Sequence, residues 1–128
     1  MANNIGKFGS LLKPSQAEHY TFKLFSRVEN ALDSFLPTPV VFKGRLANEK
    51  EKNKFVVVNG ILSENRGLYV VSTRLPSEVQ INDRIMLNNN YYLVEAVGYY
   101  AQSENLLNES KFSPEFLTAR YTKGIKLI

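Results

Sequence analysis

The sequence predicts a mainly β fold: a small β-barrel or sandwich with a minor helix, an extended N-terminal arm and a C-terminal tail. Apolar and polar side chains alternate in several short segments, as they do in half-buried strands. Turn residues separate these segments at short spacing, so about five to seven strands are expected. The 128 residues are enough for one self-supporting domain and too few for two.

Residues 1–18 are expected to form the extended arm. Their apolar side chains are isolated among glycine, asparagine and serine, a pattern too sparse for a core element. Such a terminus becomes ordered when a partner holds it. The side chains expected to make that contact are Ile5, Phe8, Leu11 and Leu12.

A single β domain is expected over residues 19–128, including the C-terminal tail strand. Alternation predicts its first strand over residues 20–28. One turn of helix is expected over residues 29–36, and the prolines at 37 and 39 end it. A second strand is predicted over residues 40–46.

The middle of the chain predicts a charged loop and two further strands. Residues 49–54 alternate in charge, which indicates an exposed loop whose electric field largely cancels. Residues 55–58 are rich in β-branched side chains and predict a strand, with a bulge or sharp bend at Gly60. A turn at residues 65–67 then leads to a strand predicted over residues 68–74.

The clearest local unit is a β-hairpin. Residues 84–87 are expected to pair with residues 91–94 across a turn made by Asn88–Asn90. Asparagine suits this turn because it tolerates a positive φ better than any residue except glycine. A loop is expected over residues 102–112, and residues 113–115 have the N-cap, proline and acidic side chain typical of a short helical turn.

The last segment, residues 116–128, predicts a strand followed by a tail. The tail ends on the apolar side chains of Ile125, Leu127 and Ile128. An ordered apolar end needs a strand edge or groove to lie against, so these side chains are expected to contact a subunit or partner. Two adhesive ends around one compact domain are typical of a subunit of a large assembly.

Composition and motifs exclude most catalytic chemistry. The chain has no cysteine and one histidine, His19, so it has neither a thiolate nor a multi-histidine metal site. It lacks the glycine-rich phosphate loops and the nucleophile elbow of a serine hydrolase. We therefore expect no enzyme activity, no cofactor, no metal and no small-molecule substrate.

Charge and hydropathy indicate the surroundings of the protein. A net charge of +4 and a pI near 9.3 favour anionic neighbours such as nucleic acid. The N-terminal residues lack the apolar run of a signal peptide, and no apolar stretch reaches 18 residues. Synthesis and assembly in a reducing cytoplasm, without a membrane, are therefore expected.

The arrangement of residues 20–101 resembles the head-closure (stopper) and head-tail joining proteins in the neck of tailed bacteriophages. The resemblance lies in two early strands, a variable insertion and a hairpin that begins with Asp83-Arg84-Ile85-Met86-Leu87 and continues with Tyr91-Tyr92-Leu93-Val94. Members of this family share a similar Asp-Arg-apolar segment, a turn and a Tyr-x-Val/Ile segment. This chain differs in having three asparagines where glycine is usual, and in its long terminal segments.

The resemblance implies a virion structural protein that forms a homo-oligomeric ring, commonly of twelve copies. Such a ring lies between other neck and tail proteins around the channel for packaged DNA. A loop from each subunit approaches the axis of the ring and helps retain the genome, and the arm and tail would hold neighbours by strand addition. Candidate channel loops are residues 49–54, with Lys50, Lys52 and Lys54, and residues 102–112.

Other readings remain open. The nearest alternative is a tail-terminator or adaptor ring protein. From a different class, an OB-like protein that binds single-stranded nucleic acid would use tyrosines such as those of the pairs 91–92 and 99–100 to stack bases. In another interpretation of each tyrosine pair, one side chain packs in the core and the other lies at the rim of a subunit contact. A small enzyme that depends on Asp83 or His19 is the third reading.

Overall fold

The computed structural model describes residues 19–31, 33–62, 67–101 and 114–128. The predicted arm, with Ile5, Phe8, Leu11 and Leu12, lies outside the described residues. So do two residues of the predicted 65–67 turn, the predicted 102–112 loop and Ser113.

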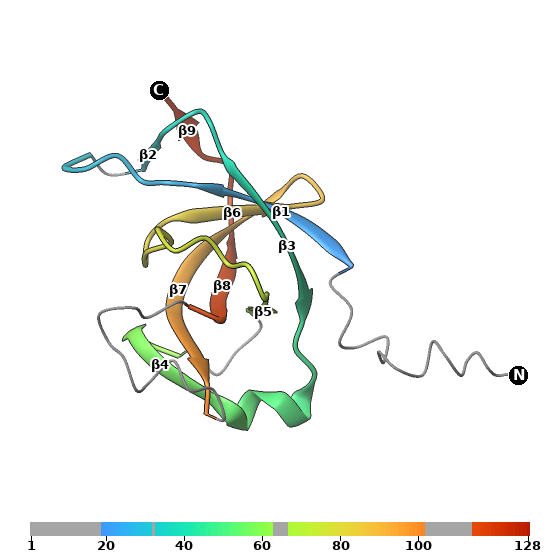
Figure 1. The fold of residues 1–128 in the computed structure, drawn as a ribbon. Helices are drawn as coiled ribbons and strands as arrows, with labels where there is room; N and C mark the ends of the chain where they lie inside the picture. The colour runs from blue at the N-terminus through green and yellow to red at the C-terminus, as the bar shows by residue number, and fades with distance from the viewer. Residues whose placement is uncertain (1–18, 32, 63–66, 102–113) are drawn as a thin grey trace, which may run out of the picture.

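The main sheet has seven antiparallel strands in the order β4-β7-β6-β1-β3-β5-β8. Because β8 also pairs with β7, the strands from β7 to β8 in this order form a ring of pairings, to which β4 is added at β7, and the sheet curls into a small β-barrel (Figure 1). The predicted β-barrel or sandwich class is therefore confirmed. The strand bounds are β1 (Tyr20–Phe25), β3 (Val40–Leu46), β4 (Phe55–Gly60), β5 (Leu68–Val71), β6 (Arg84–Leu87), β7 (Asn90–Tyr100) and β8 (Phe116–Thr122).

Strand β7 is the longest strand and connects the two ends of the barrel. One edge of β7 pairs with β6 near its start and with β4 near its end. The other edge pairs with β8 over residues 91–98. A second, two-stranded parallel sheet, formed by β2 (Ser34–Phe35) and β9 (Lys126–Leu127), lies at one end of the barrel (Figure 1).

Two apolar cores lie on opposite faces of the sheet. Val70 belongs to the larger core, which includes Phe22 and Leu24, whereas its neighbour Val71 belongs to a second core. Successive side chains of a strand point to opposite faces, so the second core lies outside the barrel wall. Its central contact is the stack of Phe55 on Phe116, with ring centroids 4.1 Å apart. The start of β4 is thereby fastened over the start of β8.

The predicted hairpin is present, with a shorter turn than expected. Leu87 pairs with Asn90, so Asn88 and Asn89 form a two-residue turn and Asn90 already belongs to β7. Asn88 and Asn89 have φ of 52° and 68°, the left-handed values that such a tight turn requires. The tolerance of asparagine for these values explains why the turn forms without glycine.

Several predicted elements differ from the structure. The helical turn expected over residues 29–36 is wrong: the chain makes irregular turns with positive φ at Asn30 and Asp33 and then forms β2. Asparagine and aspartate favour such turns, which interrupt a helix. Pro114 and Glu115 are not helical either, because the amide of Glu115 donates to the carbonyl of Gly98 at 2.8 Å and guides the chain into β8.

The predicted strand ends were also too late in two places. The first strand ends at Phe25 and the strand predicted over residues 68–74 ends at Val71. The Ser72 hydroxyl donates to the carbonyl of Lys43 and accepts from the amide of Arg74, which turns the chain out of the sheet. The β4 ladder is irregular between Val57 and Asn59, and Gly60 has φ of 92°. The expected irregularity in β4 is therefore present, one to two residues earlier than Gly60.

Candidate functional site

The run of alternating charge forms a capped 3-10 helix, η3 (Glu49–Lys54), which we call the basic turn. Asn48 is its N-cap: its side chain accepts from the amide of Glu51 at 3.0 Å, and the Glu51 carboxylate accepts from the amide of Asn48 at 3.0 Å. This reciprocal capping box satisfies amides that would otherwise lack partners at the start of the helix. The expected irregular loop is thus an ordered element.

The basic turn is fastened to the barrel by Arg45 and Tyr100. Both terminal nitrogens of the Arg45 guanidinium donate to the Glu51 carboxylate, at 2.7 and 2.6 Å. The Tyr100 hydroxyl donates to the same carboxylate at 2.6 Å and accepts from Arg45 at 2.8 Å. This charge-assisted network closes over the second core, which Tyr100 also contacts.

The network shifts the protonation of its members. The bond from the Arg45 guanidinium, followed by that from the Tyr100 hydroxyl, outweighs burial and lowers the pKa of Glu51 to about 2. Burial and the adjacent Glu51 raise the pKa of Tyr100 to about 12. Glu51 is therefore ionised and Tyr100 protonated at neutral pH.

The ion pair between Glu51 and Arg45 changes the net charge that the basic turn presents to solvent. The sequence alternation predicted a field that largely cancels, but the Glu51 charge is paired inward with Arg45. With Glu51 left out of the count, the formal charges of the turn are those of three lysines and one glutamate, Glu49. Lys50 and Lys54 are exposed. The net positive charge of this surface is therefore larger than the alternation of charges predicted.

The predicted C-terminal contact residues lie at the opposite end of the barrel from the basic turn (Figure 1). The tail folds back so that β9 pairs with β2 of its own chain, with Leu127 opposite Phe35. Ile125 is half-buried, whereas Leu127 and Ile128 are 43% and 59% exposed. Leu36, the residue after β2, is 48% exposed. We call Leu36, Leu127 and Ile128 the C-terminal apolar patch.

Asp83 and Arg84 hold the segment that carries β2. The two carboxylate oxygens of Asp83 accept from the amides of Arg27 and Gln80, at 3.0 and 2.9 Å. Burial raises the pKa of Asp83, and these two amides oppose that shift. The Arg84 guanidinium lies 4.8 Å from the centre of the Phe35 ring. Asp83 thus has a structural partner for each of its oxygens.

Comparisons of the chain with known protein families, curated proteins and solved structures find no match. Within the described residues, no group of three potential ligands can hold a metal ion, and no helix is long and apolar enough to cross a membrane. A function for this chain is therefore inferred from the geometry of its described surfaces.

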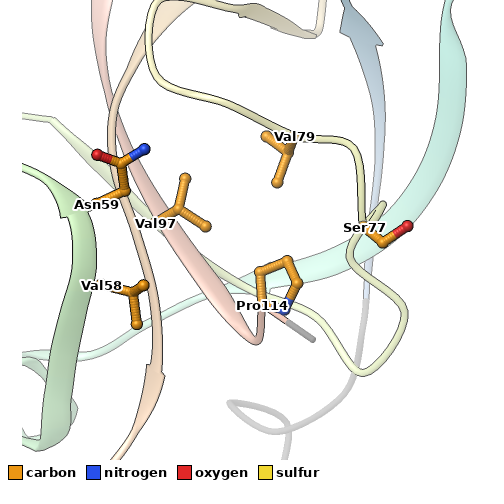
Figure 2. Close-up of a pocket in the computed structure, with 6 residues that line it drawn as sticks. All are labelled: Val58, Asn59, Ser77, Val79, Val97 and Pro114. Carbon is orange, nitrogen blue, oxygen red and sulfur yellow. The ribbon is translucent and has the colours of Figure 1, made fainter. Parts of the chain in front are cut away.

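A hollow of about 210 Å³ lies between β4, β7 and the loop that precedes β6. Val58, Val79, Val97 and Pro114 form most of its wall (Figure 2). Asn59 and Ser77 supply its polar groups, and none of the described residues that line it is titratable. Such a wall offers apolar contact and no acid–base pair.

The tyrosine pairs do not form an exposed row. Tyr99 is buried, and Tyr91, Tyr92 and Tyr100 are half-buried. Among the described residues, the exposed aromatic side chains are those of Tyr20 and Tyr121. These lie on β1 and β8, strands that do not pair with each other.

Sequence reasoning missed the partners that organise both surfaces. It named the lysines of the basic turn but not Arg45 and Tyr100, which lie 6 and 49 residues from Glu51. It named the tail but did not predict that Leu36 is exposed beside it or that Arg84 lies over Phe35. A charged residue inside a predicted strand, as Arg45 is, was the available signal, because such a residue needs a partner when buried.

Proposed function

We propose that this chain is a structural subunit of a tailed-bacteriophage neck ring, which joins head to tail and helps retain the packaged DNA. The C-terminal apolar patch carries the proposal. Three large apolar side chains are exposed on neighbouring residues of a terminal strand pair. Large apolar side chains exposed at one end of a domain are typical of a protein contact, and a copy of this chain or another neck protein is the partner that the family resemblance implies.

The barrel supports an architectural role. Its two cores and closed ladder make a rigid body, and the residues with interaction potential lie at its ends. The described residues that line the hollow beside Val58 are mostly apolar and include no titratable group. A rigid domain with interaction surfaces at both ends suits ring assembly in a virion, after synthesis in the host cytoplasm.

The basic turn supports a role in retaining DNA. Its lysines lie on a capped 3-10 helix, and the charge of Glu51 in that helix is paired with Arg45. Lysines placed in this way attract phosphates without reading sequence. In a ring the same turn recurs in every subunit, so weak contacts with DNA add up around the channel. Lys50, Lys52 and Lys54 are the residues proposed to face it.

Two other functions are distinguished from this one by experiment. A tail-terminator or adaptor protein would also form rings, with different neighbours. An OB-like single-strand binder needs several aromatic side chains along one open face. The separate positions of Tyr20 and Tyr121 favour the ring over that alternative.

The test is the mass of the full-length protein by native mass spectrometry and light scattering over a range of concentrations. We expect ring-sized species, visible as rings by electron microscopy, that are weakened by deletion of residues 1–18 and by Leu127→Asp/Ile128→Asp. Val41→Asp is the matched control, because Val41 is a comparably exposed apolar residue outside the patch. A monomer at all concentrations would overturn the proposal, and salt-dependent binding of single strands by that monomer would favour the OB-like function.

A further inference from the structure

The β9 strand is held to its own chain by little more than backbone pairing. Its ladder with β2 is two residues long, and the amide of Ile128 adds one bond to the carbonyl of Phe35 at 3.1 Å. The side chains of Lys126, Leu127 and Ile128 are all exposed. Leu127 and Ile128 are already 43% and 59% exposed while β9 is paired, so part of the apolar surface of β9 faces water before it detaches.

The connection between β8 and β9 does not fix the direction in which the tail leaves the barrel. Lys123 and Gly124 follow β8 and are exposed. A Cβ atom built at Gly124 would meet nothing within 4 Å among the described residues outside its chain neighbours, so the space beside it is open. Residues 123–128 span about 20 Å when extended.

The acceptor strand, β2, is held independently of the tail. Its other edge bonds to the preceding segment: the amide of Val28 donates to Ser34 at 2.8 Å, and the amide of Leu36 donates to Ser26 at 2.9 Å. Phe35 is fully buried beneath Arg84. Asp83 fixes the same segment through the amide of Arg27. Removal of β9 would thus leave an intact strand edge beside an exposed Leu36.

We propose that β9 is exchanged between subunits: the tail of one copy leaves its own β2 and pairs with β2 of a neighbouring copy. The occupant is the same segment that fills this edge within one chain, so the fit of tail to acceptor is already present in the fold. Exchange of an identical element is a low-cost route to assembly, because it remakes the contacts that it breaks. The inference rests on the proposed assembly role and specifies the contact that joins the copies.

The absence of cysteine makes a direct test possible. Ser34 and Lys126 are partners in the β2–β9 register, so cysteines at these positions are placed for a disulfide. Chains with Ser34→Cys and chains with Lys126→Cys, distinguished by mass, are expressed together at full length and oxidised mildly. Neither variant can form this disulfide within one chain. Exchange predicts a Ser34→Cys–Lys126→Cys heterodimer on a non-reducing gel, several-fold above the level with Val41→Cys in place of Ser34→Cys.

A second variant tests whether exchange is needed for assembly. When both substitutions, Ser34→Cys and Lys126→Cys, are in one chain and the monomer is oxidised, the disulfide keeps β9 on β2 of its own chain. Assembly should then be prevented until the disulfide is reduced. A heterodimer no more abundant than the Val41→Cys control would overturn the exchange. Rings without the cross-link would leave the neck function standing and refute the exchange, whereas cross-linked dimers without rings would support the exchange and refute the ring.

Discussion

Arg45 on β3 and Glu51 on the basic turn form a bidentate ion pair, with nitrogen–oxygen distances of 2.7 and 2.6 Å. The pair is largely screened from solvent, since the two side chains are 11% and 16% exposed. Tyr100 bonds to both partners, so three elements are joined at one point. This junction turns a run of charges into an ordered surface and seals the second core.

Loss of the Glu51 carboxylate should destabilise the fold. Glu51→Gln keeps the shape of the side chain but leaves Arg45 without its counter-charge, which should lower the free energy of unfolding by about 2 kcal/mol. Urea unfolding at neutral pH measures this. Glu78→Gln removes an exposed carboxylate and should change stability by less than about 0.5 kcal/mol. Equal effects of the two variants would contradict the role of the ion pair.

The same carboxylate should contribute to acid sensitivity. Its pKa is lowered from 4.5 to about 2 in the folded protein, so the stabilisation is present above pH 4.5 and is lost as the pH falls towards 2. The difference in unfolding free energy between the wild-type protein and Glu51→Gln should therefore shrink over that range. Urea titrations at a series of acidic pH values check this, and a constant difference would argue against it.

Asp83 should matter for structure through both of its oxygens. Asp83→Asn places an amide nitrogen against a backbone N–H donor, so one of the two bonds to Arg27 and Gln80 is lost. We expect a loss of about 1–3 kcal/mol. Asp33→Asn is the control, because the Asp33 side chain is 87% exposed. Thermal unfolding compares the two variants, and equal melting temperatures would be inconsistent with the structural role.

Gly98 should tolerate no side chain. A Cβ atom there would overlap the carbonyl oxygen of Val56 and lie 2.7 Å from the Phe116 ring. Gly98→Ala should separate β4 from β7 and cost about 3 kcal/mol or more, whereas Gly124→Ala should be close to neutral because space is open around Gly124. Denaturant midpoints for the two variants test the contrast, which fails if Gly98→Ala is as stable as Gly124→Ala.

Asn89 should require a residue that accepts a left-handed backbone. Its φ is 68°, so Asn89→Val introduces a β-branched residue at a strained conformation and should cost about 1–3 kcal/mol. Asn89→Gly relieves the strain in the fold but adds freedom to the unfolded chain, so it should be nearly neutral. Equilibrium unfolding of both variants decides the matter, and an unaffected Asn89→Val protein would rule out the strain.

The local elements were predictable where short-range chemistry decides them. The strand predicted over residues 40–46 and the asparagine turn after Leu87 each depend on a few neighbouring residues, and both are present. The predicted helical turn over residues 29–36 was wrong because β2 is stabilised by Arg84 and the tail, which lie far away in the chain.

The sequence by itself determined a mainly β domain, its hairpin, a cationic balance and an apolar tail, because alternation, turn chemistry and composition act locally. Only the tertiary structure decided that β7 pairs with β8, that Arg45 and Tyr100 both bond to Glu51, and that the tail returns to β2. Each of these contacts depends on how the strands are arranged in the sheet. Such pairing depends on the register of the whole sheet, which no single segment encodes.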